Sequence, residues 1–521
     1  MSLLALAGVL RTLKTSLPPW WLIATALIPI ALIALPLVYV ITSATEAGWS
    51  GIRDELFRAY TLSLLTNTLV LAISVTLGAS VIGIAVAWCV ERTDLPGRRA
   101  WRVIASLPLA VPAFVSSFAW SSMGAQFQNM AGAILVLTLA SYPLVYLPVA
   151  AALRGMDTGF EDVSRSLGRG PWHTFFFTIL PQARPALGGG ALLVLSHMLA
   201  EFGALSLLRV QTFTTAIFSS YELRFDNVSA AMQAGVLLLL ALFAAYTEMR
   251  MRAGTRYSRV GKGTTRHPGL LALGRATPWV LLGQTVLSIL ALGVPIVALG
   301  YWLTVGNSAG AGLDGVWQAV WGSGTLSIAG AIVTTLLAIP LVLLATRFSG
   351  RLAQFADRLP YIVHGLPGLV IALALVYFSI HYVPAIYQSV LVLILAYAVL
   401  ALPMAQTALR ASVVLVPPKL EEISRSLGRG PFRAFVSVTL PNIAPGIGAA
   451  LALLTLELMR ELTATLMLAP TNVVTLATEV WSHTNDAEYA AAAPFAALLV
   501  LVSAVPVYVF TRRTLEAHSI I

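Results

Sequence analysis

The chain has 521 residues, of which 58% are hydrophobic and only 10% are charged, with a net charge of +10 and a mean hydropathy of +0.85. Soluble domains carry about 25% charged residues, so this composition excludes an ordinary soluble protein. A single cysteine, Cys89, excludes a disulfide framework. We therefore expect an all-α polytopic membrane protein, because only helices or closed barrels can span a bilayer.

Apolar segments long enough to cross a bilayer recur along the whole chain. A spanning helix needs about 20 apolar residues, so the charge-free stretches 103–153 and 359–409 each hold two crossings. The pattern predicts about twelve spans. In chain order they are expected at 20–43, 63–90, 103–124, 131–153, 184–207, 229–249, 277–303, 322–346, 359–380, 387–409, 443–468 and 489–511.

The basic residues lie almost entirely on one side of this twelve-helix scheme. If the N-terminus is inside, the cytoplasmic segments hold all of the 32 Lys and Arg residues except Arg53, Arg58, Arg209, Arg224 and Arg460. The positive-inside rule then predicts that both termini are cytoplasmic. The same distribution accounts for the net charge without a nucleic-acid partner. The apolar start, MSLLALAGVL, lacks a small-residue cleavage site after it, so we expect it to be retained.

The chain contains an internal repeat, displaced by 260 residues. EDVSRSLGRGPWHTFFFTILP at 161–181 lies over EEISRSLGRGPFRAFVSVTLP at 421–441. We interpret this as two parallel six-helix halves. The expected organisation is a first half, 1–249, with a cytoplasmic loop at 154–182; a basic linker, 250–276; and a second half, 277–521, with a cytoplasmic loop at 410–442.

Each repeated loop should fold as helix, turn, helix at the cytoplasmic surface. Apolar residues recur every three or four positions, which is typical of short amphipathic helices. Gly168 and Gly428 interrupt this pattern, and the dipeptides Gly170–Pro171 and Gly430–Pro431 restart it. The sequence thus predicts short helices at approximately 157–171 and 417–431.

The repeated phrase resembles the cytoplasmic signature of binding-protein-dependent ABC importer permeases, in which Glu-Ala-Ala is followed by Gly and then by Ile-x-Leu-Pro. The resemblance implies that each loop is a coupling helix seated in a cleft of a separate ATPase, two copies of which bind each chain. It also implies a prokaryotic plasma (inner) membrane location. The implied ATPase-coupling residues are Asp162, Ser164, Leu167, Gly168, Gly170, Leu180 and Pro181, with Glu422, Ser424, Leu427, Gly428, Gly430, Leu440 and Pro441 in the second copy.

The chain lacks the residues needed to hydrolyse ATP. No GxxxxGK[ST] phosphate-binding motif occurs, and RVGKGTT has neither its spacing nor a Ser or Thr after the Lys. CxxC and HExxH motifs are also absent, so we assign no catalytic residues and no enzyme activity. We expect no cofactor on this chain, with ATP and Mg²⁺ on the partner ATPase.

Three further segments resemble the fused ferric-iron importers. They are AEFGALSLLRVQTFTTAIFSSY at 200–221, LPYIVHGLPGLVIALALVYF at 359–378 and MRELTATLMLAPTNVVTLATEVW at 459–481. In that family such segments form central helices and external loops, which implies that 208–228 and 469–488 meet an extracytoplasmic substrate-binding protein. Thiamine is the first alternative cargo, followed by polyamines, phosphonates and sulfate. A secondary transporter is a remote alternative, against which the duplicated loops argue.

Ionisable residues inside the apolar segments are candidates for the transport pathway, because charge at membrane depth usually faces a bundle interior or an aqueous path. The candidates are His197, Glu201, Glu457 and Glu461, and the last two are the 260-shifted equivalents of the first two. Glutamates facing each other across the pathway would favour a cation. The alternative is structural pairing, with Arg460 neutralising a neighbouring glutamate. The residues leave open whether the chain itself binds metal.

Overall fold

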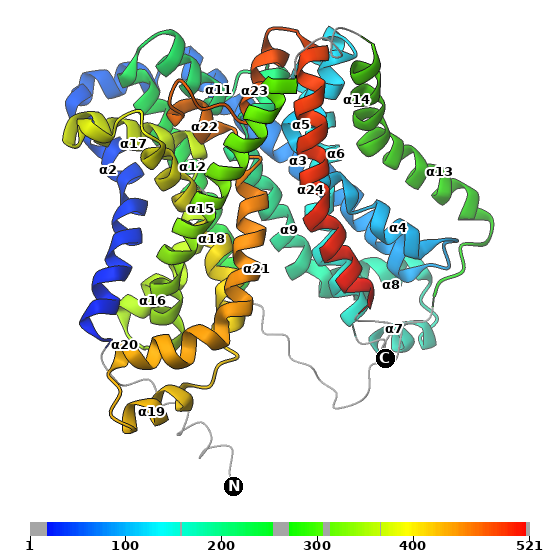
Figure 1. Cartoon of the computed structure of the whole chain (residues 1–521). Coiled ribbons are helices and arrows are strands. Elements are labelled where there is room, and N and C mark those ends of the chain that lie inside the picture. Colours follow the sequence, from blue (N-terminus) through cyan, green and yellow to red (C-terminus); the bar gives the residue numbers. More distant parts are fainter. Residues whose placement is uncertain (1–17, 157–158, 254–269, 306–312, 365, 517–521) are drawn as a thin grey trace. The chain divides into compact units, whose positions relative to one another are not determined.

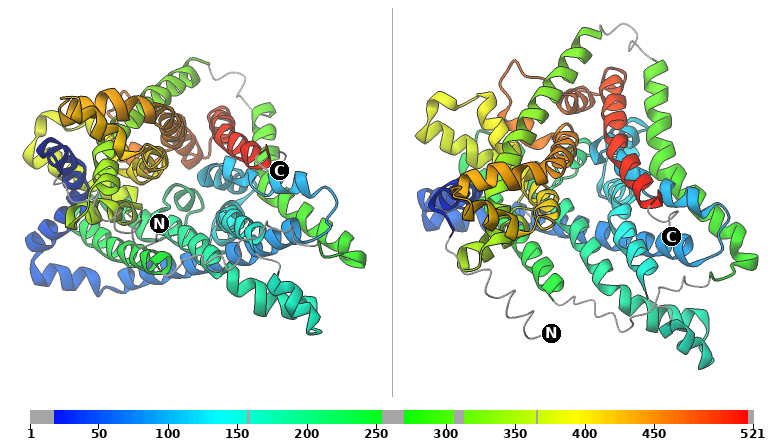
Figure 2. Two further views of the ribbon diagram at one scale, coloured as in Figure 1. Left: turned by 90° about the horizontal axis from the view of Figure 1, so that it is seen from below. Right: turned by 60° about the horizontal axis from the view of Figure 1, so that its bottom comes forward.

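A computed structural model describes residues 18–156, 159–253, 270–305, 313–364 and 366–516 (Figure 1). These residues form helices joined by short connections, as two further views also show (Figure 2). The only extended pairing among them is an isolated bridge between Thr93 and Leu271. The predicted all-α class is therefore confirmed.

The helices follow one another in an order that parallels the sequence repeat. In the first half they are α2 (Trp20–Leu56), α3 (Ala59–Arg92), α4 (Arg98–Ile104), η1 (Leu107–Ala110), α5 (Ala113–Ser122), η2 (Ala125–Phe127), α6 (Met130–Gly155), α7 (Gly159–Ser166), α8 (Pro171–Thr174), η3 (Phe175–Ile179), α9 (Leu180–Ala200), α10 (Gly203–Leu207), α11 (Phe213–Phe218), η4 (Ser219–Leu223) and α12 (Asn227–Ala253).

The second half begins after the linker, most of which lies outside the described residues. Its helices are η5 (Gly274–Ala276), α13 (Thr277–Ser288), η6 (Ile289–Gly293), α14 (Val294–Thr304), α15 (Leu313–Arg347), α16 (Arg351–His364), α17 (Gly368–Tyr382), η8 (Pro384–Ile386), α18 (Val390–Val413), α19 (Pro418–Ser426), α20 (Pro431–Ala434), η9 (Phe435–Thr439), α21 (Leu440–Leu458), α22 (Thr463–Leu468), α23 (Leu476–Asn485) and α24 (Tyr489–Glu516).

Eight of the described helical segments are long and apolar enough to cross a membrane, and each contains or overlaps a predicted span. A ninth is the pair Arg98–Ala110 and Ala113–Ser122, which is bent by 85°. Two shorter apolar helices, Gly368–Tyr382 and Tyr489–Val505, occupy predicted spans, and α9 occupies another. All twelve predicted segments are thus helical, but length and composition alone do not support twelve continuous spans.

Breaks inside the predicted spans explain this difference. Pro112 precedes α5 and Pro367 precedes α17, and neither proline has an N–H to continue a helix. The predicted spans 184–207 and 443–468 are also interrupted, because α9 ends at Ala200 and α21 at Leu458. Each of these two single predicted spans is therefore two helices, α9 with α10 and α21 with α22.

The packing divides the chain into two compact units that differ from the two sequence halves. One unit contains Met1–Ile52 and Trp317–Thr478, and the other contains Arg53–Val316 and Glu479–Ile521. Thus α2 packs with helices of the second repeat, and α24 packs with helices of the first. Sequence repetition and packing therefore describe two different divisions of the chain.

Small residues allow the helices of each unit to approach closely. A Cβ added to Gly83 of α3 would lie 2.9 Å from the Val145 Cβ of α6 and 3.0 Å from the backbone N of Tyr146. In the other unit, a Cβ at Gly330 of α15 would lie 2.9 Å from a methyl group of Leu458. Close backbone contact through small residues is the usual way in which membrane helices associate.

Candidate functional site

The two repeated loops have the same backbone structure. Helix α7 is followed by a turn and by the continuous series α8, η3 and α9; α19 is followed in the same way by α20, η9 and α21 (Figure 1). Gly168 has a φ of +75° and Gly428 a φ of +83°. The backbone N–H of Arg169 donates to the carbonyl of Ser164 at 3.2 Å, and Arg429 donates to Ser424 at 3.3 Å. Each helix therefore ends in a Schellman turn with glycine in the left-handed position.

Each loop exposes an apolar surface at matched positions. Val163 and Ile423 are each 58% exposed, and Leu167 and Leu427 are 72% and 76% exposed. Trp172 and its equivalent, Phe432, are also exposed. We call Val163, Leu167 and Trp172 the first loop knob, and Ile423, Leu427 and Phe432 the second loop knob. An exposed apolar surface repeated at two equivalent sites is typical of a protein-docking surface.

The remaining predicted coupling residues shape the loops or lie on their surface. Ser164 and Ser424 are buried, and Ser164 Oγ lies 3.0 Å from Thr174 Oγ1. Glu422, Gly170 and Gly430 are exposed. The side chain of Asp162 lies outside the described residues. The two Leu-Pro pairs lie at the start of the long helices that follow, Leu180–Pro181 in α9 and Leu440–Pro441 in α21. Proline is favourable in the first turn of a helix.

A buried ion pair anchors the first loop to the end of α3. Arg92 Nη1 lies 2.7 Å from Glu161 Oε1, and the two side chains are 2% and 7% exposed. Sequence reasoning missed this pair, although Glu161 directly precedes the signature. Because burying a charge is costly unless it is paired, the contact holds α7 in one position against α3.

The neighbouring residue of α3 connects two more helices. Glu91 is 1% exposed and pairs with Arg102 of α4 at 2.8 Å and with Arg154 of α6 at 2.6 Å. Two adjacent residues of α3 therefore connect α7, the bent segment that begins with α4, and the helix α6 that precedes the loop. We call these five charged residues the α3 charge cluster.

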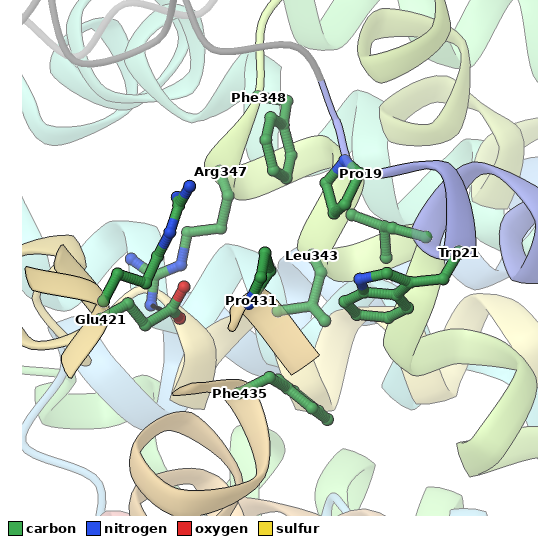
Figure 3. Close-up of a pocket in the computed structure, with 10 residues that line it drawn as sticks. Pro19, Trp21, Leu343, Arg347, Phe348, Glu421, Pro431 and Phe435 are labelled. Atoms are coloured by element: carbon green, nitrogen blue, oxygen red, sulfur yellow. Dashed lines mark ion pairs between the residues drawn. The ribbon is translucent and has the colours of Figure 1, made fainter. Parts of the chain in front are cut away.

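The second loop has a looser version of the same anchor. Arg347, the last residue of α15, lies 3.9 Å from Glu421 (Figure 3). Its guanidinium also donates a hydrogen bond to the carbonyl of Val416 at 2.8 Å. Glu421 also accepts a hydrogen bond from Thr439. A direct ion pair between Asp357 of α16 and Arg410 of α18 links the helices that correspond to α4 and α6. This link is half-exposed, whereas the α3 charge cluster is mostly buried.

The two predicted pathway glutamates have identical positions at the helix breaks. Glu201 Oε1 accepts a hydrogen bond from the backbone N–H of Ala204 at 2.9 Å, and Glu461 Oε1 accepts one from Ala464 at 3.0 Å. Both carboxylates therefore satisfy an N–H that begins a short helix, α10 or α22. The sequence predicted their equivalence but not this capping contact.

The other two pathway candidates differ from each other. His197 Nε2 lies 3.6 Å from Glu201 Oε2, so this pair is in contact although α9 ends at Ala200 and Glu201 lies just beyond it. Glu457 instead pairs with Arg460. Because α21 ends at Leu458, Glu457 and Glu461 do not lie on one continuous helix, and their predicted shared face was wrong. Among the described residues, no group of three His, Cys, Asp or Glu side chains could hold a metal ion.

These features define a helical membrane protein with two equivalent loops that expose apolar residues at matched positions. The family of binding-protein-dependent transport system inner membrane components matches residues 79–249 and 338–514, so each repeat contains one such domain. The chain belongs to this family of multi-pass inner-membrane transport permeases. Its resemblance to ABC importer permeases, recognised in the repeated loops, is confirmed.

Individual relatives agree with this assignment. Fe(3+)-transport system permease protein FbpB 2 of Haemophilus influenzae is 44% identical over 95% of this chain and 98% of the relative. Sulfate transport system permease protein CysT of Escherichia coli is 24% identical over 47% of this chain. Molybdenum transport system permease protein ModB of Azotobacter vinelandii is 28% identical over 37%. The last two each match less than half of this chain, whereas the first matches across both repeats. All three are named as transport permeases, so the chain is a permease subunit and not an enzyme.

Proposed function

We propose that this chain imports ferric iron as the membrane subunit of an ABC importer. An extracytoplasmic binding protein delivers the iron, and a separate ATPase supplies the energy. The main support for this proposal is the 44% identity to a ferric-iron permease over 95% of the chain. The relatives named for sulfate and molybdenum support an ABC importer permease but each match less than half of the chain.

The two loop knobs dock two ATPase subunits, one on each repeat. Matched exposed apolar residues in the two repeated loops support this stoichiometry, because equal surfaces can bind equal partners. This arrangement places the loops and both termini in the cytoplasm, in agreement with the distribution of basic residues. ATP and Mg²⁺ then bind the ATPase and not this chain.

The α3 charge cluster offers a route from the first ATPase to the membrane. A displacement of α7 acts on Arg92 through Glu161, and so acts directly on the end of α3. Glu91 carries the displacement to α4 and thereby to the segment bent by 85°. A bent helix pair is suited to gating because its two parts can change their angle without loss of their own hydrogen bonds.

Glu201 and Glu461 each combine a helix-capping contact with a negative charge, and a Glu→Gln substitution separates the two. Each caps a short helix, which any permease of this kind needs, and each brings a carboxylate to a break in a membrane segment. Only the carboxylate charge would favour a cation over an anion. The capping contact alone explains why a glutamate is present at both positions. The assignment of ferric iron as the cargo therefore depends on the similarity to the ferric-iron permease and not on Glu201 and Glu461.

Copurification and transport test this proposal. The permease purified from native membranes should retain an ATPase at two copies per chain. In proteoliposomes, binding protein loaded with ferric iron should drive uptake that requires internal ATP. A permease that purifies without an ATPase and transports down an ion gradient would instead be a secondary transporter. ATP-driven uptake of thiamine but not iron would retain the machine and reject the cargo.

A further inference from the structure

A pocket with a volume of about 110 Å³ lies beside the second coupling helix (Figure 3). Its walls come from the start of α2, the end of α15, α19 and η9, all of which belong to one compact unit. Leu343 and Phe435 provide apolar walls, while Trp21, Arg347 and Arg425 provide N–H donors. Glu421 is the acidic group of the lining.

Two of these donors are buried without an acceptor in the described part of the chain. They are Nε1 of Trp21 and Nε of Arg347, whose side chain is only 10% exposed. Arg425, which also lines the pocket, is exposed. Buried donors normally have acceptors, so two unsatisfied donors beside one pocket indicate that a ligand supplies the acceptors.

The first repeat shows how the pocket arises. Counted back from the terminal arginines of α3 and α15, Trp88 is the equivalent of Leu343. Trp88 packs edge-on against Phe175 with ring centroids 4.6 Å apart, and Phe175 is the equivalent of Phe435. The smaller Leu343 cannot occupy the volume of an indole ring. The position that Trp88 fills in the first repeat is thus held by a smaller side chain in the lining of this pocket.

The two anchoring arginines differ accordingly. Arg92 lies 2.7 Å from its glutamate, whereas Arg347 lies 3.9 Å from Glu421. Arg347 therefore interacts less strongly with the carboxylate of Glu421 and can also pair with a bound anion. With Arg425, the pocket has two positive groups against one negative group.

We propose that this pocket binds a phosphate-bearing anion. Arginine suits phosphate because its planar donors match the oxygen geometry, and basic pockets between membrane helices on the cytoplasmic side accept lipid headgroups. The phosphate can come from an anionic phospholipid or from free inorganic phosphate. Because Glu421 and Arg425 both lie on α19, the bound anion joins the second coupling helix to α2 and α15.

Filling the pocket provides the sharpest test. Leu343→Trp places in the second repeat the side chain that fills the same position in the first. Leu336→Trp is the matched control, because Leu336 lies on the same helix and is 61% exposed. Arg425→Gln removes one positive charge at an exposed position and so tests the site without altering the packing.

The purified permease is delipidated and titrated with phosphatidylglycerol, with a diacylglycerol of the same acyl chains, and with inorganic phosphate, and bound species are counted by native mass spectrometry. We expect phosphatidylglycerol or inorganic phosphate, but not diacylglycerol, to bind the wild type and Leu336→Trp. Affinity should fall at least tenfold in Leu343→Trp and in Arg425→Gln. Whichever phosphate ligand shows this pattern is the source. Wild-type affinity in both pocket variants, or equal binding of diacylglycerol, would overturn the proposal.

Discussion

Replacing the turn glycines of the coupling loops should uncouple ATP hydrolysis from transport. Gly168 and Gly428 have φ values of +75° and +83°, and a Cβ built at either would meet nothing within 4 Å. The cost of Gly168→Val and Gly428→Val is therefore purely conformational. A side-chain-bearing residue in this region loses about 1–2 kcal/mol, which lowers the population of the capped turn by a factor of about 5–30 in each loop.

Gly189→Val and Gly448→Val are the control variants, in the helices α9 and α21 that follow the loops. A Cβ at these positions also meets nothing within 4 Å, and neither glycine has a positive φ, so valine is tolerated there without backbone strain. The assay compares solute imported with ATP hydrolysed in proteoliposomes that contain the whole complex. We expect the ratio to fall at least fivefold in the Gly168/Gly428 double variant and to stay near the wild-type value in the controls. Coupled uptake that survives in the double variant would refute the role assigned to these turns.

Three other predictions follow from the anchors, the helix breaks and the topology. Arg92→Met should lower the free energy of unfolding of the permease by about 3–5 kcal/mol, because it leaves Glu161 buried and unpaired. Adding Glu161→Gln should restore most of this loss, as measured by thermal unfolding. Asp357→Asn, which breaks a half-exposed ion pair, should cost less than about 1 kcal/mol. Glu201→Gln with Glu461→Gln retains both capping oxygens but removes both negative charges, so uptake should fall sharply while the complex still assembles. If uptake falls only in the corresponding Glu→Ala variants, the two glutamates have a structural role. Loops 208–228 and 469–488 should react only from outside with an impermeant thiol reagent, in a chain in which Cys89 is replaced by Ala. The labelled cysteines belong at Leu223 and Asn485, because Ser220 and Thr484 are buried; labelling from the cytoplasm would contradict the topology.

Sequence reasoning reached the features that depend on local chemistry. The apolar runs predicted helical segments, and the repeated Gly and Pro residues predicted the turns after α7 and α19. These features could be predicted because φ preferences and hydrophobic length act within a few residues. The repeat also paired Glu201 with Glu461 correctly, since both cap a helix in the same way.

Features that depend on tertiary packing could not be predicted in the same way. Arg92 and Glu161 are 69 positions apart (161 minus 92), and nothing local marks their contact. The packing of α2 with the second repeat is likewise invisible in a hydropathy pattern. The breaks near Glu201 and Glu461 lie inside apolar runs that satisfy the length rule for a single helix. Comparison of the two repeats offers a signal that could have found the anchor, because α3 and α15 both end in arginine and both loops begin with a glutamate.

The most direct test of the central claim is cargo-dependent uptake by the reconstituted complex. The permease with its copurified ATPase is placed in proteoliposomes, and separate samples of the binding protein are offered radiolabelled ferric iron, thiamine, sulfate and molybdate. The account predicts accumulation of ferric iron that needs internal ATP and is lost in the Gly168→Val/Gly428→Val double variant. Accumulation of another solute in place of iron, or of iron without ATP hydrolysis, would contradict it.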